Sequence, residues 1–399
     1  MKKFVLALLT AATLITPTTQ VLANSPNVSA PIAVVMCYNT GDILYDRNMN
    51  QRWIPSSMTK IMTAFITYQE IEAGNLSLDS TVRISQTVAN FSQNRRVEGS
   101  FVPLTAGSNI TVENLPRLTM LPSSNGAAMA LAEAISGTEA AFVERMNQTA
   151  RDLGMYASFT NSHGAHAHHS NAYSIARLIR AFIQQYPDIL RITNMRTANV
   201  AGSNHSNTNR LVHPGAHYFS GADGFKTGVI RASGWGHSTT AYRDGQRVIA
   251  VLMNTSSNDA RQSQSRTLLQ FGFDELARRA ADVTNRIEVF YHGRALPLES
   301  RAQFHDDMIF LPAADVLRPI GLRLSWDSAL RTMTVRDEDG RASAATIGTR
   351  SASARGQSIR LHTAPRMVNN RVYVPVDFIE AVTGTNVTWD RESGRVEFR

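Results

Sequence analysis

One predicted helix, residues 55–73 (PSSMTKIMTAFITYQEIEA), carries a serine and a lysine at its start, Ser57 and Lys60. Gly74 and Asn75 end its apolar pattern. Residues three apart lie on one face of a helix, so the lysine amine can reach the serine hydroxyl. A lysine can take the proton of a serine if burial and a second cation lower its pKa. The segment therefore predicts a nucleophilic serine with a lysine as its base.

Predicted strands and helices follow on both sides of this segment. The strands are residues 32–38, 43–45 and two within 228–253 around an Asp-Gly turn, and the further helices are 126–135, 140–153, 172–185 and 268–281. Strands at both ends with helices between them indicate a mixed α/β (α+β) domain over residues 24–280. We expect an antiparallel sheet flanked by helices.

Two further motifs complete a set with Ser57 and Lys60, namely the S-x-N run Ser123 to Asn125 and the K-T-G run Lys226 to Gly228. Each motif alone is weak, but the three in this order are the signature of penicillin-recognising serine enzymes. Lys226 would be the second cation that lowers the pKa of Lys60. The Ser123 hydroxyl could relay a proton between the two lysines and the leaving amine, and the Asn125 amide could hold a substrate backbone group.

The K-T-G segment also predicts a substrate cradle. Lys226, Thr227 and Gly228 open a strand whose exposed edge could pair with an extended peptide, and Gly228 would let the two backbones approach closely. The tetrahedral intermediate needs backbone N–H donors, and the amides of Ser57 and Val229 are the natural pair.

Residues 32–275 resemble the D-alanyl-D-alanine carboxypeptidases, the low-molecular-mass penicillin-binding proteins, in the runs PSSMTKIMTA (55–64) and DGFKTG (223–228). The resemblance implies a serine β-lactamase/DD-peptidase-like fold and an acyl-enzyme on Ser57. It further implies peptidoglycan stem peptides as substrate, β-lactams as covalent inhibitors and no cofactor. In that family an arginine beyond the third motif binds the terminal carboxylate, and Arg261 matches its position. The chain departs from the family where Ser124 and Gly126 replace Gly and Asp, and where Ile230 replaces Thr.

Two other functions remain open. A β-lactamase shares all three motifs, but no Glu occurs between Arg145 and Asp274 to drive rapid hydrolysis of a penicilloyl adduct. A non-catalytic penicillin-binding or wall-binding protein is suggested by the altered second motif. Zinc binding by His163, His166, His168 and His169 is disfavoured, because these residues approximate a family loop near the cleft, and we expect no metal.

The last 120 residues contain an internal repeat. Gly293, Leu298, Pro312, Gly321, Trp326 and Asp327 recur 63 positions later as Gly356, Leu361, Pro375, Gly384, Trp389 and Asp390. We expect two β-rich copies, residues 281–340 and 341–399, in which the polar segment 350–354 is an edge strand or a loop. The copies resemble the copper amine oxidase N-terminal-like domain of exported Gram-positive-type proteins. They lack clustered His or Cys ligands for copper and could contact the cell wall.

The first 23 residues predict export. Lys2 and Lys3 precede an apolar run over residues 4–15, and a small-residue cleavage site lies before Asn24. We expect a secreted protein in the cell envelope of a Gram-positive-type bacterium. The net charge of +8 is dispersed, which favours attraction to an anionic wall over binding of nucleic acid. The single cysteine, Cys37, is expected in a buried strand.

Overall fold

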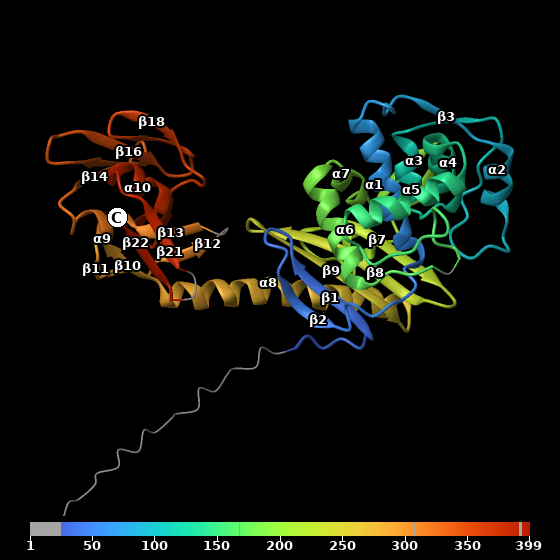
Figure 1. Cartoon of the computed structure of the whole chain (residues 1–399), viewed down its shortest axis with the longest axis horizontal. Helices are drawn as coiled ribbons and strands as arrows, with labels where there is room; N and C mark the ends of the chain where they lie inside the picture. Colours follow the sequence, from blue (N-terminus) through green and yellow to red (C-terminus); the bar gives the residue numbers. More distant parts are fainter. Residues whose placement is uncertain (1–24, 167, 306–307, 391–392) are drawn as a thin grey trace, which may run out of the picture.

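The computed structural model describes residues 25–166, 168–305, 308–390 and 393–399, and Figure 1 shows two lobes joined by one long helix, α8 (Asn258–Arg286). The predicted signal peptide, residues 1–23, lies outside the described residues. Within the described part of the chain, no helix is both long and apolar enough to cross a membrane.

The larger lobe is built on a five-stranded antiparallel sheet of order β2-β1-β9-β8-β7. Its strands are β1 (Ile32–Cys37), β2 (Ile43–Arg47), β7 (Ala222–Ile230), β8 (Gly234–Arg243) and β9 (Gln246–Thr255). The predicted strands 32–38 and 43–45 are confirmed and pair as a hairpin, and the predicted turn at Asp244 is confirmed. Cys37 is buried in β1 with a free thiol, as expected. Strand β7, which carries the K-T-G motif, lies at the edge of the sheet.

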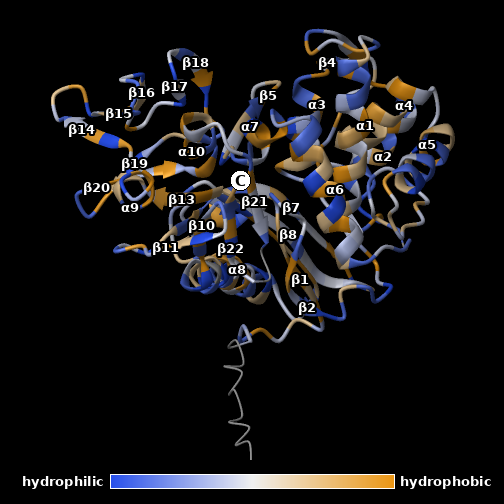
Figure 2. Cartoon of the chain, turned by 60° about the vertical axis from the view of Figure 1, so that its left-hand side comes forward, coloured by the Kyte–Doolittle hydropathy of each residue, from blue (hydrophilic) through white to orange (hydrophobic). Residues whose placement is uncertain are grey.

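Helices cover both faces of this sheet because successive residues of its inner strands point to opposite sides. Val34 and Met36 of β1 pack in one core with α1 (Lys60–Glu72) and α6 (Ala172–Gln185), whereas Ala33 and Val35 pack in another core with α8. Figure 2 shows hydrophobic residues in α1, α6 and the sheet strands. The other elements of this lobe are η1 (Ser56–Thr59), β3 (Thr81–Arg83), α2 (Gln86–Gln93), β4 (Asn109–Thr111), α3 (Asn114–Met120), α4 (Asn125–Ser136), α5 (Glu139–Asp152), α7 (Ile189–Thr193), β5 (Thr197–Val200), β6 (Ser203–Ser206) and η2 (Arg210–Val212).

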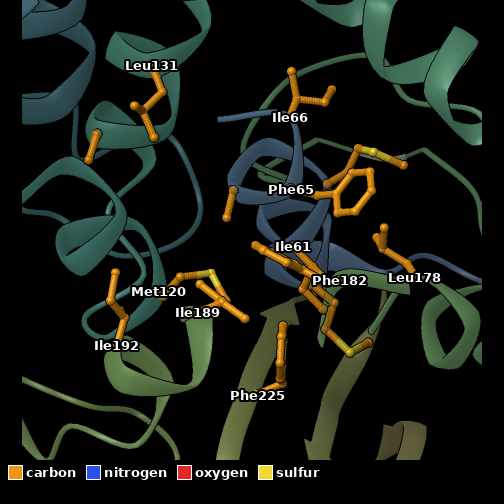
Figure 3. Packing of buried hydrophobic residues seen from close by; sticks show 14 of the residues in the cluster. Ile61, Phe65, Ile66, Met120, Leu131, Leu178, Phe182, Ile189, Ile192 and Phe225 are labelled. Atoms are coloured by element: carbon orange, nitrogen blue, oxygen red, sulfur yellow. The ribbon is translucent and has the colours of Figure 1, made fainter. Parts of the chain in front are cut away.

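Helix α1 lies in the centre of the larger lobe. Nine of its 13 residues are buried, and these include the polar Lys60, Thr63, Thr67 and Glu70. Phe65 packs edge-on against Phe182 of α6 at 5.4 Å between ring centroids, and Phe182 packs against Phe225 of β7 at 5.8 Å (Figure 3). These contacts fix the start of α1 against the edge strand.

Helix α8 begins ten residues before the predicted closing helix and ends five residues after it. Its extra first turns are polar, so apolar periodicity could not reveal them, but the Ser257 hydroxyl accepts a hydrogen bond from Ala260 N and caps the helix. Gly272 allows α8 to lie close to the sheet, because a Cβ there would stand 2.6 Å from Val248 Cγ1. The predicted domain boundary near residue 280 falls within α8 and stays a prediction.

The smaller lobe repeats one set of elements 63 residues apart. The first set is β10 (Glu288–Tyr291), β11 (Arg294–Leu296), β12 (Gln303–His305), β13 (Met308–Pro312), α9 (Ala313–Leu317), β14 (Arg323–Asp327) and β15 (Thr332–Arg336). The second set is β17 (Ser351–Ala354), β18 (Gln357–Arg360), β19 (Arg366–Val368), β20 (Arg371–Pro375), α10 (Val376–Thr383), β21 (Val387–Asp390) and β22 (Arg395–Phe398). Strand β16 (Ala342–Thr346) connects the two sets.

The two copies share their sheets, which have the orders β11-β10-β22-β21, β12-β13-β20-β19 and β14-β15-β16-β17-β18. The expectation that segment 350–354 is an edge strand or a loop is wrong, because β17 lies between β16 and β18. The polar residues of this segment gave no apolar pattern from which to predict a strand. In the structure Ala352 and Ala354 pack on the core, while the alternate serines point away.

Candidate active site

Ser57 and Lys60 meet at the junction of η1 and α1. Lys60 Nζ lies 3.0 Å from Ser57 Oγ, with Ser57 6% exposed and Lys60 fully buried. The turn that presents Ser57 packs tightly on the edge strand, since a Cβ on Gly228 would lie 2.8 Å from the Pro55 carbonyl oxygen. Gly228 thus allows β7 to approach the protein's own η1 backbone.

Two fixed acceptors surround the amine of Lys60, namely Asn125 Oδ1 at 2.7 Å and the His163 carbonyl oxygen at 2.5 Å. Burial and the charge of Lys226 lower the pKa of Lys60 well below its ordinary value. A neutral amine has two N–H groups and one lone pair. If both N–H groups bind these acceptors, the lone pair is left to receive the Ser57 proton.

The second motif forms the opposite wall of the site. Ser124 caps α4 by accepting a hydrogen bond from Ala127 N, which gives the residue that replaces the family glycine a structural role. Asn125 Nδ2 donates to the Glu98 carbonyl oxygen at 3.2 Å, so in this structure both ends of the Asn125 amide have protein partners.

Ser123 is strained and its hydroxyl is unpaired. Its φ is 68°, it is 5% exposed, and its Oγ has no hydrogen-bond partner among the described residues. The structure therefore shows no hydrogen bond from Ser123 to either lysine. A buried unpaired hydroxyl on a strained backbone is a feature found at functional sites.

Lys226 belongs to the edge strand β7 and is 1% exposed, and its Nζ donates to the Thr227 carbonyl oxygen at 3.2 Å. Burial and the charge of Arg261 lower the pKa of Lys226 to about 7. The hydroxyl of Thr227 lies 2.7 Å from that of Thr208.

Arg261 comes from the first turns of α8 and is 4% exposed, so it is not a surface arginine. Its Nη1 donates to the Gly228 carbonyl oxygen at 3.2 Å, and its guanidinium lies 4.8 Å from the Trp235 ring centroid. Burial and the charge of Arg210 lower the pKa of Arg261 to about 10. This side chain links α8 to the end of the K-T-G motif.

A cleft of about 320 Å³ opens over these groups, and its lining includes Ser57, Ser123, Thr227, Gly228, Val229 and Arg261. The structure thus brings together side chains from η1, the loop before α4, β7 and α8. Lys60, Asn125 and Lys226 lie directly beside them.

Three further contributors were not predicted: the His163 carbonyl, the Glu98 carbonyl and the Thr208 hydroxyl. Only His163 lies in a segment whose pattern drew attention, and there the backbone oxygen makes the contact. Every residue type has a backbone carbonyl, so the sequence gives no signal for the contacts of the His163 and Glu98 carbonyls.

Two of the four histidines near the cleft, His163 and His168, are buried, and each has a ring nitrogen with a protein partner. His168 Nε2 contacts the Thr59 hydroxyl, and His163 Nδ1 lies 3.1 Å from Ala165 N. Burial lowers the pKa of His163 well below its ordinary value and that of His168 to about 4. No group of three His, Cys, Asp or Glu side chains in the described part of the chain is placed to hold a metal ion.

Two family models match the chain. The family model described as D-alanyl-D-alanine carboxypeptidase matches residues 19–257, and the copper amine oxidase N-terminal domain model matches residues 290–398. The chain is 32% identical over 254 residues to the D-alanyl-D-alanine carboxypeptidase DacF of Bacillus subtilis (strain 168), covering 62% of each chain. It is 30% identical over 286 residues to the D-alanyl-D-alanine carboxypeptidase of Streptomyces sp. (strain K15), covering 67% of this chain and 94% of that protein.

Solved structures are similar over the larger lobe. A peptidoglycan synthesis regulatory factor (PBP3) from Streptococcus pneumoniae has a TM-score of 0.59 at 30% identity, covering 62% of this chain and 72% of that one. Ampicillin-bound penicillin-binding protein D2 from Listeria monocytogenes has a TM-score of 0.54 at 25% identity, covering 62% and 98%. The match spans less than two thirds of the length of DacF and of DacD from Salmonella typhimurium, 62% and 65%.

Proposed function

Because this chain belongs to the D-alanyl-D-alanine carboxypeptidase family, we propose that it removes the terminal D-alanine from peptidoglycan stem peptides through an acyl-enzyme on Ser57. The observation that carries the proposal is the Lys60 amine, held by two carbonyl-type acceptors with its remaining position toward Ser57 Oγ. β-Lactams would acylate the same hydroxyl and inhibit the enzyme.

Acylation begins when Ser57 Oγ attacks the carbonyl carbon of the penultimate D-alanine while Lys60 takes the hydroxyl proton. The backbone N–H groups of Ser57 and Val229 bind the developing oxyanion. As the C–N bond breaks, Ser123, with its unpaired hydroxyl in the cleft, gives its proton to the leaving amine and regains one from Lys60, and Lys226 supports this relay electrostatically. Free D-alanine leaves, and water later hydrolyses the ester.

Substrate recognition rests on strand β7 and on Arg261. An extended stem peptide pairs with the free edge of β7, and Thr227 and Arg261 bind the terminal carboxylate. Asn125 takes the peptide amide by exchanging the Glu98 carbonyl for a substrate carbonyl. This recognition explains a requirement for a free C-terminus.

The alternative of a non-catalytic penicillin-binding protein has one specific observation in its favour, the occupied Asn125 amide. A β-lactamase is less well supported, because the chain has no Glu between Arg145 and Asp274. The penicilloyl adduct of this protein should therefore be slow to hydrolyse.

The test is labelling with fluorescent penicillin, together with D-alanine release from a peptide ending in D-Ala-D-Ala. We expect both activities in the wild type and neither in Ser57→Ala, with Ser56→Ala as the neighbouring-serine control that keeps some labelling. Labelling without release would favour the non-catalytic alternative, and rapid loss of the label would favour a β-lactamase.

The remaining predictions concern the whole chain. We propose export after cleavage of residues 1–23, a catalytic domain over residues 24–280, and repeats 281–340 and 341–399 that contact the wall of a Gram-positive-type cell. The family acts on the cell wall, which supports an envelope location. Fractionation of the source cells, with N-terminal sequencing of the mature protein, tests the export proposal.

A further inference from the structure

A second pocket lies in the smaller lobe, where the two repeat copies meet. Its volume is about 720 Å³, against about 320 Å³ for the cleft at Ser57. Leu324, Trp326 and Met333 line it from β14 and β15 of the first copy, and Met367 and Arg371 line it from β19 and β20 of the second. Its volume lies within the range of small-molecule sites, ~300–1,000 Å³.

The internal duplication shows what is unusual about this pocket. Trp389 in β21 corresponds to Trp326, and Phe304 in β12 corresponds to Met367, each 63 residues away. Phe304 of the first copy packs against Trp389 of the second copy at 5.1 Å between ring centroids. At the equivalent position for Trp326 of the first copy, the second copy supplies the narrower Met367, and Trp326 stays 40% exposed. The tryptophan of the second copy is thus covered by an aromatic ring from the first, whereas beside the tryptophan of the first copy there is room for a ring.

The walls of the pocket suit an uncharged ligand with one apolar face. Arg371 is fixed by Asp315 at 3.0 Å and Glu299 at 3.2 Å. With the exposed Arg318, the lining holds two carboxylates and two guanidiniums, so their formal charges cancel. An exposed indole beside hydrogen-bonding side chains matches a pyranose ring, which has an apolar C–H face and polar edges.

We infer that this pocket binds the glycan strand of peptidoglycan through its N-acetylated sugars. The choice of glycan rests on the proposed function, because stem peptides are attached to such strands. Helix α8 has 29 residues and a length of about 43 Å, so it holds the pocket well apart from the Ser57 cleft. The smaller lobe would hold a strand while the cleft acts on peptides.

The test uses the full chain carrying Ser57→Ala, titrated calorimetrically with the β-1,4-linked tetramer of N-acetylglucosamine and with glycan stripped of peptides. Trp326→Ala and Met367→Phe are each expected to weaken binding at least tenfold. Met367→Phe copies the contact that Phe304 already makes with Trp389, so it should fill the pocket without unfolding the lobe. Thermal unfolding checks this point.

A matched control, Leu330→Ala, removes a 68% exposed side chain outside the pocket and should bind like the parent. Unchanged binding in both pocket variants, or binding of free stem peptide but not of stripped glycan, would overturn the inference. Failure of the catalytic proposal would appear separately, as wild-type protein that penicillin does not label.

Discussion

Lys60 shows how a single amine can be prepared for proton transfer. Lys60→Arg keeps a positive charge that does not titrate in the working range, so it cannot accept the Ser57 proton. We expect acylation by penicillin to fall by about 10²–10⁴-fold, the usual contribution of general base catalysis. Stopped-flow labelling measures the rate, and a thermal melt confirms folding. Near wild-type acylation by a folded Lys60→Arg protein would remove Lys60 from the mechanism.

Lys226 makes the stability of the protein depend on pH. Burial lowers its pKa from 10.5 to about 7, so between these pH values the unfolded chain binds more protons than the folded one. The free-energy cost of burying the Lys226 amine is largest below pH 7 and disappears as the pH rises toward 10.5. We expect the free energy of unfolding to rise with pH across this window, and to rise less in Lys226→Met.

Urea unfolding of both proteins at pH 6, 8 and 10 measures this difference. Part of the slope should remain in Lys226→Met, because burial also lowers the pKa of Lys60. Equal slopes in the two proteins would contradict a depressed pKa at Lys226.

At the residue scale, spacing and chemistry predicted most of the site. A spacing of three residues sufficed to predict Lys60 against Ser57, and the resemblance to the family pointed to Arg261, which lines the cleft. What could not be predicted depends on tertiary packing. The His163 carbonyl reaches Lys60 across 103 residues of chain, and nothing local to residue 163 encodes that contact.

At the scale of elements, the contact between β7 and η1 can be tested with two glycines. A Cβ on Gly228 would lie 2.8 Å from the Pro55 carbonyl oxygen, which belongs to the backbone. A Cβ on Gly236 of the neighbouring strand would lie 2.9 Å from Met58 Cε, the end of a flexible side chain. We expect Gly228→Ala to displace η1 and to lower both the melting temperature and penicillin labelling.

Gly236→Ala should be milder in both measurements, because Met58 can change rotamer. Comparable loss in the two variants would mean that space on β8 matters as much as the contact with η1. Calorimetry and quantitative labelling at one protein concentration provide the comparison.

Helices and strands with regular apolar patterns were predicted close to their true positions, as α6 shows. The two elements that were not predicted correctly, the first turns of α8 and strand β17, share a physical cause. The first turns of α8 are polar because Arg261 and Ser265 face the buried end of the site, and β17 is built of serine and alanine. Periodicity in hydrophobicity cannot detect an element whose buried residues are polar or small.

At the scale of the whole molecule, α8 sets the relation between the lobes. Ala281 is exposed on this helix, and proline there would cost about 3 kcal/mol in helix stability, against about 1 kcal/mol for glycine. We expect Ala281→Pro to leave hydrolysis of a free pentapeptide unchanged but to reduce release of D-alanine from polymeric peptidoglycan severalfold. Ala281→Gly, the matched control, should lie between wild type and Ala281→Pro on the polymer. Loss of both activities together would instead show that the catalytic lobe depends on an intact α8.

The parallel pairing of β10 with β22 has a consequence for biosynthesis. Glu288 opens the smaller lobe and pairs with Arg395 near the far end of the sequence. The first strand of that lobe, β10, can therefore pair only with β11 until nearly all of the lobe has been synthesised. Each hairpin within the lobe can close as soon as it is synthesised. As the chain is synthesised, the larger lobe can complete its sheet first, and a frameshift upstream of β22 would leave an open, aggregation-prone edge on an otherwise finished enzyme.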